Sequence, residues 1–503
     1  MLKPKALYIR SLKCDLLKML KTRNILILFA SIIALRLIVA LTMGLMPQDA
    51  YYFFYSENLD WSYFDHPPMV AYMLKLFTSI LGTSVWAIKM TNFIVTMGSL
   101  YFFHYLAKLF LSKDKANVAS IMYGSTLLLT VLSINTTPDV PLILFWTLTI
   151  IALYKAVFEG KLIYWILGGI LAGMSFDSKY TAAIIVAGLI FFLLVSKNYR
   201  RYLFSKEILL FLIFFGITIY PIYYWNEQHD WISFSFQTSG RSGSVSKFGL
   251  KPKYFFGNLG TQLGLLLPVL FYFVYKVIFK YGGQTIKKKA LPSDKKLFLL
   301  SFSVPILLFF SLISLVYWVK LNWMMPGYVT AVILAAPFIK KKYIKPQLIT
   351  AIVVNILFFV QVAFYPVNVK SDDTWYGWEE LSEKIKDVKK EHTDTFIFSN
   401  DGYKTSAVMN YYLDEKVYSG NVIGYGGLQF SIVDKDLSHL EGKDAIFIDS
   451  EKRFKNLEKS GTERKDLMKY FSNVEELEPI IINSKSGKPL RKFLIFKAID
   501  YKN

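Results

Sequence analysis

The segment NILILFASIIALRLIVALTMGL at residues 24–45 decides the fold, because Arg36 is its only charged side chain. A helix that spans a membrane needs about 17–25 consecutive, mostly apolar residues. The segment is too long for the apolar core of a signal peptide, and no small-residue cleavage site follows it. It therefore predicts an uncleaved membrane-spanning helix.

Ten similar segments follow, in a chain of 503 residues that is 54% hydrophobic and 17% aromatic. The segments at 118–134, 162–176 and 180–195 reach spanning length only with their flanking residues. All eleven together predict an α-helical polytopic membrane body over residues 1–366, in which residues 46–84 form the first outer loop. The predicted spans are Asn24–Leu45, Val85–Phe110, Val118–Ile134, Val140–Phe158, Leu162–Phe176, Tyr180–Val195, Ile208–Trp225, Leu259–Ile278, Leu297–Trp318, Trp323–Ile339 and Leu348–Phe364.

The net charge of +21 first suggests a nucleic-acid-binding protein, but the positive mean hydropathy of +0.36 argues against that class. Residues 1–366 contain 36 Lys and Arg against 13 Asp and Glu, whereas residues 367–503 contain 22 against 24. Of those 36 basic residues, 27 fall on alternate loops, which the positive-inside rule assigns to the cytoplasm. We therefore expect a multi-pass protein of the cytoplasmic (inner) membrane with a cytoplasmic N-terminus, surrounded by membrane lipids and binding no nucleic acid.

Residues 367–503 lack long apolar runs, and an odd number of spans places them outside the cytoplasm. Short apolar segments alternate there with amphipathic ones, which predicts a compact extracytoplasmic α/β domain. The predicted strands are Thr395–Phe398, Lys443–Asp449, Pro479–Ile482 and Lys492–Ala498, and the predicted helices are Trp375–His392, Thr405–Leu413, Glu451–Ser460 and Thr462–Phe471.

Acidic residues gather on the outer side of the membrane body, where eight of the 13 lie in or beside outer loops. Carboxylates do not set membrane topology, so this bias needs another cause. Ionisable groups at membrane depth are costly and usually functional. The sequence therefore predicts a polar site at the outer surface, built from several loops.

The first outer loop contains the most informative candidates, in MPQDAYYFFYSENLDWSYFDHPPMVAY at residues 46–72. Asp49 directly follows the first span, where it could act on a substrate or simply cap the next helix, and the sequence favours neither role. Asp65 and His66 precede Pro67 and Pro68, which hold them above the following helix. Asp65 could again be a helix cap, and His66 an ordinary interfacial polar residue.

Two basic residues also lie on the outer side. Lys179 lies between two short spans, where phosphate binding competes with pairing to Asp177 and with snorkelling to the interface. Arg241 lies in SGRSGSVSKFG at 239–249, a loop that could close over a phosphate or be merely solvated.

Four motifs in this order carry a resemblance: the first outer loop, TPDVP at 137–141, SFDSKYTA at 175–182 and LNWMMPGY at 321–328. With many spans and an outer C-terminal domain, the chain resembles the integral-membrane glycosyltransferases of the GT-C class. It looks most like bacterial relatives of the dolichyl-phosphate-mannose–protein mannosyltransferases and of the aminoarabinose transferase that modifies lipid A.

The resemblance implies a role for each candidate. Asp49 matches an acid that binds or activates the acceptor, and Asp139 matches the acid of the second outer loop. Lys179 matches a lysine that contacts the donor phosphate. Asp65 and His66 stand where the lipid A enzymes have an acid linked to a divalent metal ion and a lysine linked to the donor phosphate.

These observations predict an inverting glycosyltransferase that takes a hexosyl or pentosyl group from a polyprenyl-phosphate donor. The acceptor would be lipid A or lipopolysaccharide, another cell-envelope glycan, or a protein, on the outer side of the membrane. Asp49 would deprotonate the acceptor, and Lys179, assisted by His66 or Arg241, would stabilise the departing phosphate. Asp65 and Asp139 would bind the acceptor or a metal ion, or shape the site.

The alternative from another class is a secondary transporter or a flippase for a polyprenyl-linked or envelope lipid. Such a protein predicts internal repeats and broken or charged helices near the middle of the bilayer. The sequence has no clear repeat, and its acids crowd the outer boundary instead. It also has no G-x-x-x-x-G-K-[ST] loop for ATP-driven export.

Overall fold

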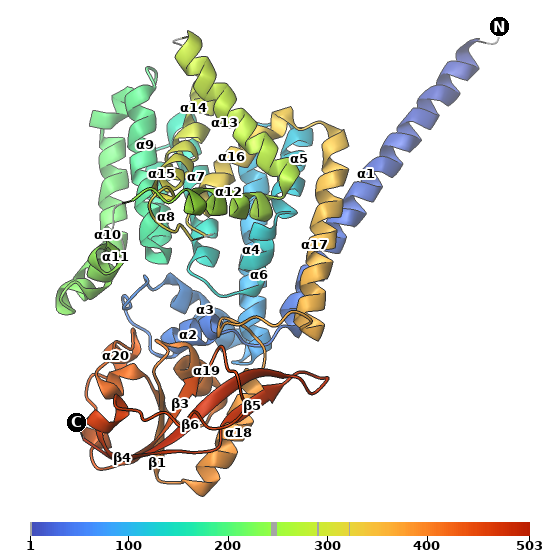
Figure 1. Ribbon diagram of the computed structural model, residues 1–503. Helices are drawn as coiled ribbons and strands as arrows, with labels where there is room; N and C mark the ends of the chain where they lie inside the picture. The colour runs from blue at the N-terminus through green and yellow to red at the C-terminus, as the bar shows by residue number, and fades with distance from the viewer. Residues whose placement is uncertain (1–2, 243–248, 289–290, 321, 503) are drawn as a thin grey trace.

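The computed structural model shows a helical body with a sheet-containing C-terminal domain at one of its ends (Figure 1). Between them lie two short helices of the first outer loop, α2 (Pro47–Glu57) and α3 (Met69–Leu81). The structure describes residues 3–242, 249–288, 291–320 and 322–502, with backbone alone for 3–22, 239–242 and 285–288.

The helical body follows the predicted apolar segments closely, because each run of apolar residues forms a helix or a pair of helices. Its other helices are α1 (Lys3–Thr42), α4 (Val85–Phe110), α5 (Lys113–Gly124), α6 (Leu127–Ile134), α7 (Asp139–Phe158), α8 (Ile163–Ser178), α9 (Ile184–Val195), α10 (Lys206–Gln228), α11 (Ile232–Ser242), α12 (Pro252–Leu266), α13 (Pro268–Lys288), α14 (Asp294–Ser301), α15 (Val304–Ile313), α16 (Met325–Ala335) and α17 (Ile344–Phe364).

Within the described residues, six helical stretches are long and apolar enough to cross a membrane, or up to eight if two bent pairs each count as one span. The chain is therefore a multi-pass membrane protein, whereas the predicted number of eleven spans is not confirmed. The six are Arg23–Thr42, Val85–Phe110, Asp139–Phe158, Lys206–Gln228, Asp294–Ile313 and Lys341–Phe364.

The predicted span Leu259–Ile278 is wrong as a single straight helix. The chain breaks at Leu267, so that α12 and α13 meet at a bend of 116°. Leu267 has a φ of +64°, and Pro268 follows it directly. Proline has no amide hydrogen to continue a helix and forces the preceding residue out of the helical region, which explains the break.

Arg36 is the charged residue inside the first predicted span, and the structure shows why it is tolerated. Its side chain is fully buried, and its Nη2 donates to the carbonyl oxygen of Thr126 at 2.7 Å. Its Nε donates to the Thr130 hydroxyl at 2.8 Å. Thr126 lies at the 59° bend between α5 and α6, where the helical hydrogen-bond ladder is interrupted. Arg36 thus satisfies a carbonyl that the break exposes.

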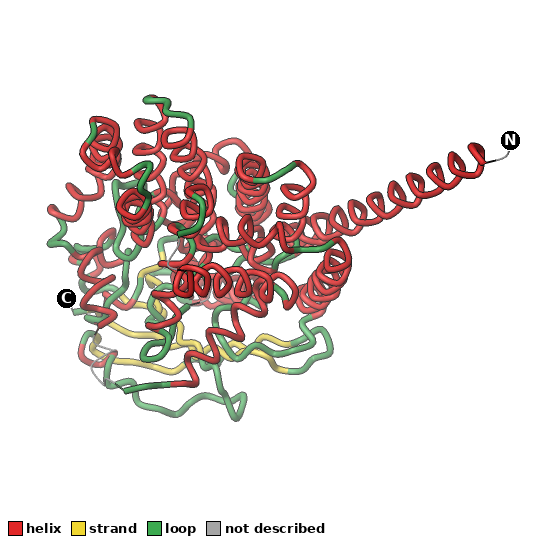
Figure 2. The backbone as a smooth tube through the Cα atoms, turned by 90° about the horizontal axis from the view of Figure 1, so that it is seen from above, coloured by secondary structure: helices red, strands yellow, loops and turns green. Residues whose placement is uncertain are grey.

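The C-terminal domain contains a mixed sheet in the order β2-β1-β3-β6-β4, with β5 also paired to β6. Strands β2, β1 and β3 run parallel to one another, whereas β6 pairs antiparallel with β3, β4 and β5. Figure 2, seen from above, shows the strands beneath the helices of the body. The elements are α18 (Trp378–Glu391), β1 (Thr395–Ser399), α19 (Lys404–Tyr412), β2 (Val417–Tyr418), α20 (Phe430–Val433), β3 (Asp444–Ser450), β4 (Phe471–Glu476), β5 (Ile480–Asn483) and β6 (Pro489–Tyr501).

The four predicted strands and the helices near 375–392 and 405–413 are confirmed, but two predicted helices are wrong. Glu451–Ser460 forms turns and bends, and Thr462–Phe471 contains only a short 3-10 helix at Leu467–Lys469. Its last residue, Phe471, is buried and begins β4, which pairs with β6. Of the two segments only Phe471 belongs to a strand; before it, the amides of Ser460 and Gly461 donate to the Glu476 carboxylate, and Gly461 has a φ of +62°, which is incompatible with a continuous helix.

The two faces of the sheet bury different side chains, as expected from the alternation along a strand. On one face, Ile397, Ile446 and Ile495 belong to the same continuous core as the helical body. On the other, Phe398 and Phe447 belong to a separate core within the domain. The apolar contact that runs from bundle to sheet therefore fixes the domain against the first outer loop.

Aromatic stacking makes the contact between that loop and the domain. Tyr51 stacks on Tyr403 and Phe54 stacks on Phe430, each pair with ring centroids 4.3 Å apart. The backbone amide of Phe64 donates to Oε1 of Gln429 at 2.8 Å. These contacts place the C-terminal domain on the same end of the bundle as the outer-loop candidates.

Candidate functional site

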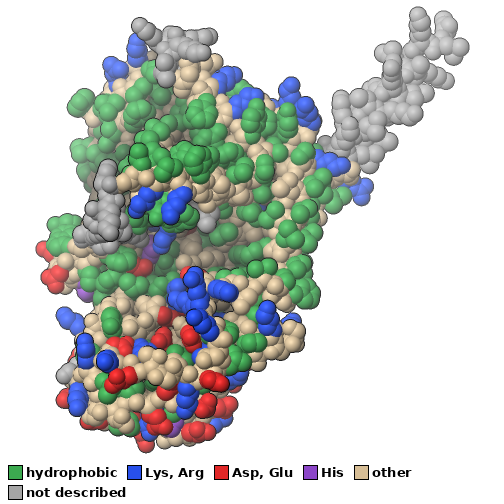
Figure 3. All heavy atoms as spheres, in the orientation of Figure 1, with side chains coloured by type: hydrophobic (Ala, Val, Ile, Leu, Met, Phe, Trp, Pro, Cys, Tyr) green, Lys and Arg blue, Asp and Glu red, His purple; other side chains and the backbone are tan. Residues whose placement is uncertain are grey.

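A polar cavity of about 60 Å³ lies at the outer-loop end of the helical body. Four segments far apart in the sequence meet there: the loop before α3, the junction of α8 and α9, α11, and the loop before α16. Figure 3 shows the recess between the hydrophobic helical body and the more charged C-terminal domain, with basic, acidic and histidine side chains inside it. The lining residues are His66, Lys179, Tyr180, Thr181, Gln237, Lys320, Asn322 and Trp323.

Lys179 lies where α8 ends and the chain turns through an extended residue into a 3-10 helix. Its Nζ donates to both carboxylate oxygens of Asp139, at 2.7 and 3.0 Å. Asp139 is fully buried in the first turn of α7, and its Oδ2 also accepts from Nδ2 of Asn322 at 2.6 Å. The structure thus brings two predicted residues together and gives Lys179 Asp139 as its partner, instead of Asp177.

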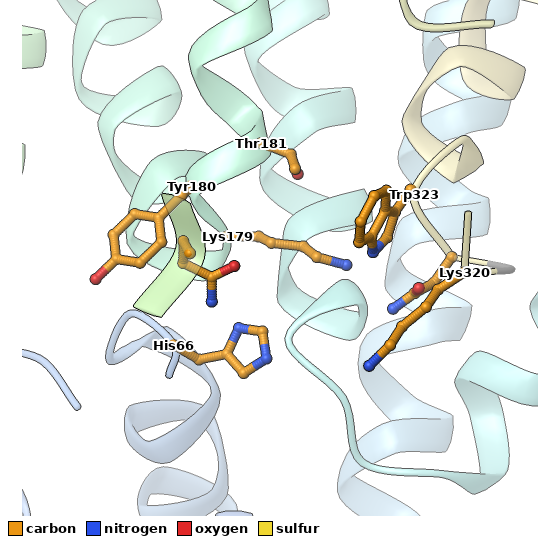
Figure 4. A pocket seen from close by; sticks show the side chains of 8 residues that line it. His66, Lys179, Tyr180, Thr181, Lys320 and Trp323 are labelled. Carbon is orange, nitrogen blue, oxygen red and sulfur yellow. The ribbon is translucent and has the colours of Figure 1, made fainter. Parts of the chain in front are cut away.

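Lys320 brings a second ammonium group to the cavity. In Figure 4 the side chains of Lys179, Lys320 and His66 point into the same space. The amides of Gln237 and Asn322 and the hydroxyl of Thr181 add neutral hydrogen-bonding groups to the lining, whereas the Tyr180 hydroxyl points away from it, toward Ser62 and Ser233. A cavity with two ammonium groups and several neutral donors suits an anion such as a phosphate, because charge-assisted hydrogen bonds are the strong ones.

Asp65 lies beside the cavity and is held by the first outer loop. Its Oδ1 accepts hydrogen bonds from the hydroxyls of Tyr51, at 3.0 Å, and Tyr55. Burial, followed by the nearby Asp65 charge, raises the pKa of both tyrosines well above their usual value, so both hydroxyls stay protonated donors. The backbone oxygen of Asp65 accepts from the side-chain amide of Gln237, which joins this loop to α11.

His66 follows Asp65 and lines the cavity. Its Nε2 lies 3.8 Å from Oδ2 of Asp65, and its ring stands 6.0 Å from that of Tyr52 in an edge-to-face arrangement. Its backbone oxygen accepts from the amide of Tyr63 at 3.2 Å. The Asp65–His66 pair is therefore built into a hydrogen-bonded loop next to Lys179.

The residues around Asp65 do not fit a divalent metal ion. Tyrosine hydroxyls already bind its Oδ1, so Asp65 and the imidazole of His66 together offer two ligand atoms, fewer than a divalent metal ion needs. Across the described part of the chain, no group of three or more His, Cys, Asp and Glu side chains could hold a metal. No step proposed below uses a metal.

Asp49 lies apart from this cavity and does not line it. It is the third residue of α2 and is fully buried. Its Oδ2 accepts from the Met46 amide at 2.9 Å and pairs with Lys89, while Oδ1 accepts from the Thr136 amide at 2.8 Å. The carboxylate therefore caps the start of α2 and joins it to α4 and to the loop before α7; its catalytic role stays a prediction.

Arg241 belongs to α11, in the last turn before Ser242. Its side chain and all of residues 243–248, Lys247 included, lie outside what the structure describes. The predicted phosphate contact of Arg241 stays a prediction.

Four residues without a predicted role line the cavity or contact a candidate residue: Lys89, Gln237, Lys320 and Asn322. Three carried a usable signal. Lys320 and Asn322 belong to or adjoin the LNWMMPGY motif, and Lys89 is a charge inside a predicted span, where ionisable groups need a partner. Gln237 carried none, because only the packing of α11 brings it to Asp65.

Parts of the chain match known proteins. Residues 65–225 match the family described as dolichyl-phosphate-mannose-protein mannosyltransferase. The lipid A galacturonosyltransferase RgtD of Rhizobium johnstonii is 22% identical over 298 residues, which are 59% of this chain and 61% of that protein. The putative mannosyltransferase YycA of Bacillus subtilis is 27% identical over 157 residues, which are 30% of this chain and 23% of that protein. The chain thus spans less than two thirds of the length of these relatives.

Two solved structures have the same overall fold as this chain. ArnT from Cupriavidus metallidurans in the apo state superposes with a TM-score of 0.59 and 11% identity, covering 94% of this chain and 98% of that chain. The same protein bound to undecaprenyl phosphate gives 0.60 and 12%, with the same coverage. The predicted fold class and the resemblance to GT-C glycosyltransferases of the mannosyltransferase and ArnT type are confirmed.

Proposed function

We propose that the chain is a membrane glycosyltransferase that moves a sugar from a polyprenyl-phosphate donor to a cell-envelope lipid of the lipid A type. The single observation that carries this proposal is the polar cavity with Lys179 and Lys320 at one end of an ArnT-like helical bundle. The site would face the outer side of the cytoplasmic membrane, with the N-terminus inside, because the basic residues concentrate on the opposite set of loops.

The donor phosphate would bind between the two lysines. When the sugar leaves, negative charge grows on the phosphate, and cations fixed in advance stabilise that charge more than they stabilise the bound donor. Asp139 and Asn322 hold Lys179 in place, so little reorganisation is needed as the charge develops. The undecaprenyl phosphate in an ArnT structure of the same fold supports a lipid phosphate as the ligand.

The same cavity supports direct displacement with inversion at the anomeric carbon. A retaining mechanism needs a carboxylate that forms a covalent sugar intermediate. Among the described residues that line the cavity, none carries a carboxylate; of the two adjacent carboxylates, Asp139 is fully buried against Lys179, and Asp65 accepts from two tyrosine hydroxyls. The acceptor oxygen would therefore attack the sugar while the bond to the phosphate breaks.

The test uses the purified full chain in detergent with undecaprenyl-phosphate-linked sugars, including a uronic acid, and lipid A as acceptor. Mass spectrometry is expected to detect lipid A heavier by one sugar residue. Parallel assays with a glycan or a peptide acceptor identify the class of acceptor. Lipid movement without sugar transfer in reconstituted vesicles would contradict the proposal and favour a flippase.

Replacing Lys320 by methionine is expected to raise the KM for the donor about tenfold, with a smaller effect on kcat. The lost charge-assisted hydrogen bond corresponds to about 1.5 kcal/mol of binding. Lys75→Met is the matched control, because Lys75 lies on outer-loop helix α3 and pairs with Glu57 outside the cavity. Steady-state kinetics at varied donor concentration make the measurement, and equal KM values for the two variants would remove Lys320 from the donor site.

A further inference from the structure

The groups around the cavity leave the acceptor proton without an obvious destination. If the acceptor is a hydroxyl group, its proton must leave as the new glycosidic bond forms. Asp49, the predicted base, is fully buried, and both of its oxygens are bound by Lys89 and by backbone amides. Asp139 is likewise fully buried and bound by Lys179 and Asn322.

His66 is the described residue lining the cavity whose side chain can take up a proton near neutral pH. It is held firmly, because Pro67 and Pro68 follow it and its backbone oxygen accepts from Tyr63. Its ring points into the same space as Lys179 and Lys320 (Figure 4). A proton acceptor and a phosphate-binding pair thus share one small cavity.

We propose that His66 is the general base of the transfer and that the acceptor is therefore a hydroxyl of an envelope lipid. This inference rests on the proposed function. The acceptor oxygen forms a bond to the anomeric carbon, the bond from that carbon to the phosphate oxygen breaks, and the hydroxyl proton passes to the imidazole. The products are the glycosylated lipid, polyprenyl phosphate with one more negative charge, and imidazolium.

The charges balance within the cavity. A polyprenyl-phosphate sugar is a diester with one negative charge, and its departure leaves a monoester that gains a second. The imidazolium of His66 forms at the same moment and in the same cavity, so the new positive charge lies close to the new negative charge. Return of the proton to solvent then weakens the attraction and favours release of polyprenyl phosphate.

Asp65 is a positioning residue in this scheme. Its Oδ2 lies 3.8 Å from Nε2 of His66, while Tyr51 and Tyr55 hold Oδ1. A carboxylate fixed in this way orients the imidazole and stabilises its protonated form. The other charged groups that face His66 are Lys179 and Lys320, which favour the neutral form, and the ring of Tyr52 packs against it.

A general base at His66 determines how the transfer rate depends on pH. The base must be neutral to act, so the transfer rate is expected to fall when acidification protonates the imidazole. His66→Gln is expected to lower kcat by about 10²–10³-fold and to remove this acidic limb, because general bases typically contribute 10²–10⁴-fold. The KM for the donor is expected to change less than about threefold, since the lysines still bind the phosphate.

His66→Lys separates this role from simple phosphate binding. A lysine supplies a positive charge for the phosphate but is protonated at pH 7 and cannot act as a base, so activity is expected to stay low there and to rise with pH. Full activity of His66→Lys at pH 7 would overturn the proposal, as would an unchanged acidic limb in His66→Gln.

Asp65→Asn is expected to move the acidic limb of the rate profile to lower pH. The rate at high pH is expected to stay within about tenfold of the wild-type rate.

Two further measurements make the outcome independent of protein folding. Binding of undecaprenyl phosphate to His66→Gln, measured by calorimetry in detergent, is expected to match the wild type and shows that the variant is folded. A wild-type pH profile that is flat between pH 5 and 8 would overturn the inference without any variant. No sugar transfer by the wild type would instead contradict the proposed function, so the two failures are distinguishable.

Discussion

Replacing Lys179 by methionine is expected to lower kcat for sugar transfer by about 10²–10³-fold, which is the usual effect of removing one group that stabilises a developing oxyanion. Methionine keeps the length and apolar character of the side chain, but it leaves the buried Asp139 carboxylate with Asn322 and no cation, so the thermal unfolding transition of the variant is measured beside its activity. The expected loss is larger for kcat than for donor affinity, because the charge on the phosphate grows in the transition state. Single-turnover transfer with saturating donor measures the chemical step.

The control for this prediction is Asp139→Asn. It keeps a hydrogen-bond acceptor for Lys179 but frees the lysine charge from its carboxylate partner. Donor binding is expected to stay the same or become tighter, while kcat falls through loss of the fixed geometry. A Lys179→Met enzyme with more than a tenth of the wild-type kcat would show that Lys179 is only a structural partner of Asp139.

The Asp49–Lys89 pair gives the largest expected effect on stability. Both side chains are fully buried, and Lys89→Met leaves the Asp49 carboxylate with two backbone amides but no cation. Breaking a buried ion pair typically costs about 3–5 kcal/mol. We therefore expect the thermal unfolding transition in detergent to fall by roughly 5–10 °C, and Asp49→Asn to behave similarly.

The double variant Asp49→Asn with Lys89→Met removes both charges and keeps an oxygen that can accept from Thr136. It is expected to recover most of the lost stability, because replacing a complete buried pair is often nearly neutral. A double variant no more stable than the single ones would show that the pair is not coupled. Its activity also tests Asp49: a stable but inactive double variant supports the catalytic prediction, and an active one restricts Asp49 to capping α2.

Much of the fold could be predicted because single segments determine it. Long apolar runs form helices in a membrane whatever surrounds them, and alternation marked the strands β1, β3, β5 and β6. The failures depend on tertiary context. Predicting the break at Leu267 would have required weighing the effect of Pro268 inside an apolar run. Strand β4 forms by pairing with the long strand β6, which its own residues do not indicate.

The sequence indicated several single residues in or beside the cavity, but it did not indicate which of them pair with one another. Motif order indicated Asp139, Lys179, Asp65 and His66, and three-dimensional packing then joined Lys179 to Asp139, which is 40 residues away in the chain. Lys320 was one of several outer lysines, and only the loop before α16 distinguishes it from the others. Such pairings depend on which helix ends meet, which a single sequence does not encode locally.

Two fully buried cations of the helical body, Lys89 and Arg36, also bear on the order in which the chain is assembled. Synthesis runs from the N-terminus, so Asp49 has already emerged when α4 delivers Lys89 to the membrane, and the lysine can be neutralised on arrival. Arg36 has no such partner upstream, because its acceptors, Thr126 and Thr130, are made about ninety residues later. An arginine near the centre of a helix disfavours insertion by about 2.5–3.5 kcal/mol. Each Leu, Ile, Val or Phe around Arg36 favours insertion by about 0.3–0.6 kcal/mol, so the first helix can still insert alone, and the α5–α6 bend later supplies hydrogen-bond acceptors to its guanidinium group.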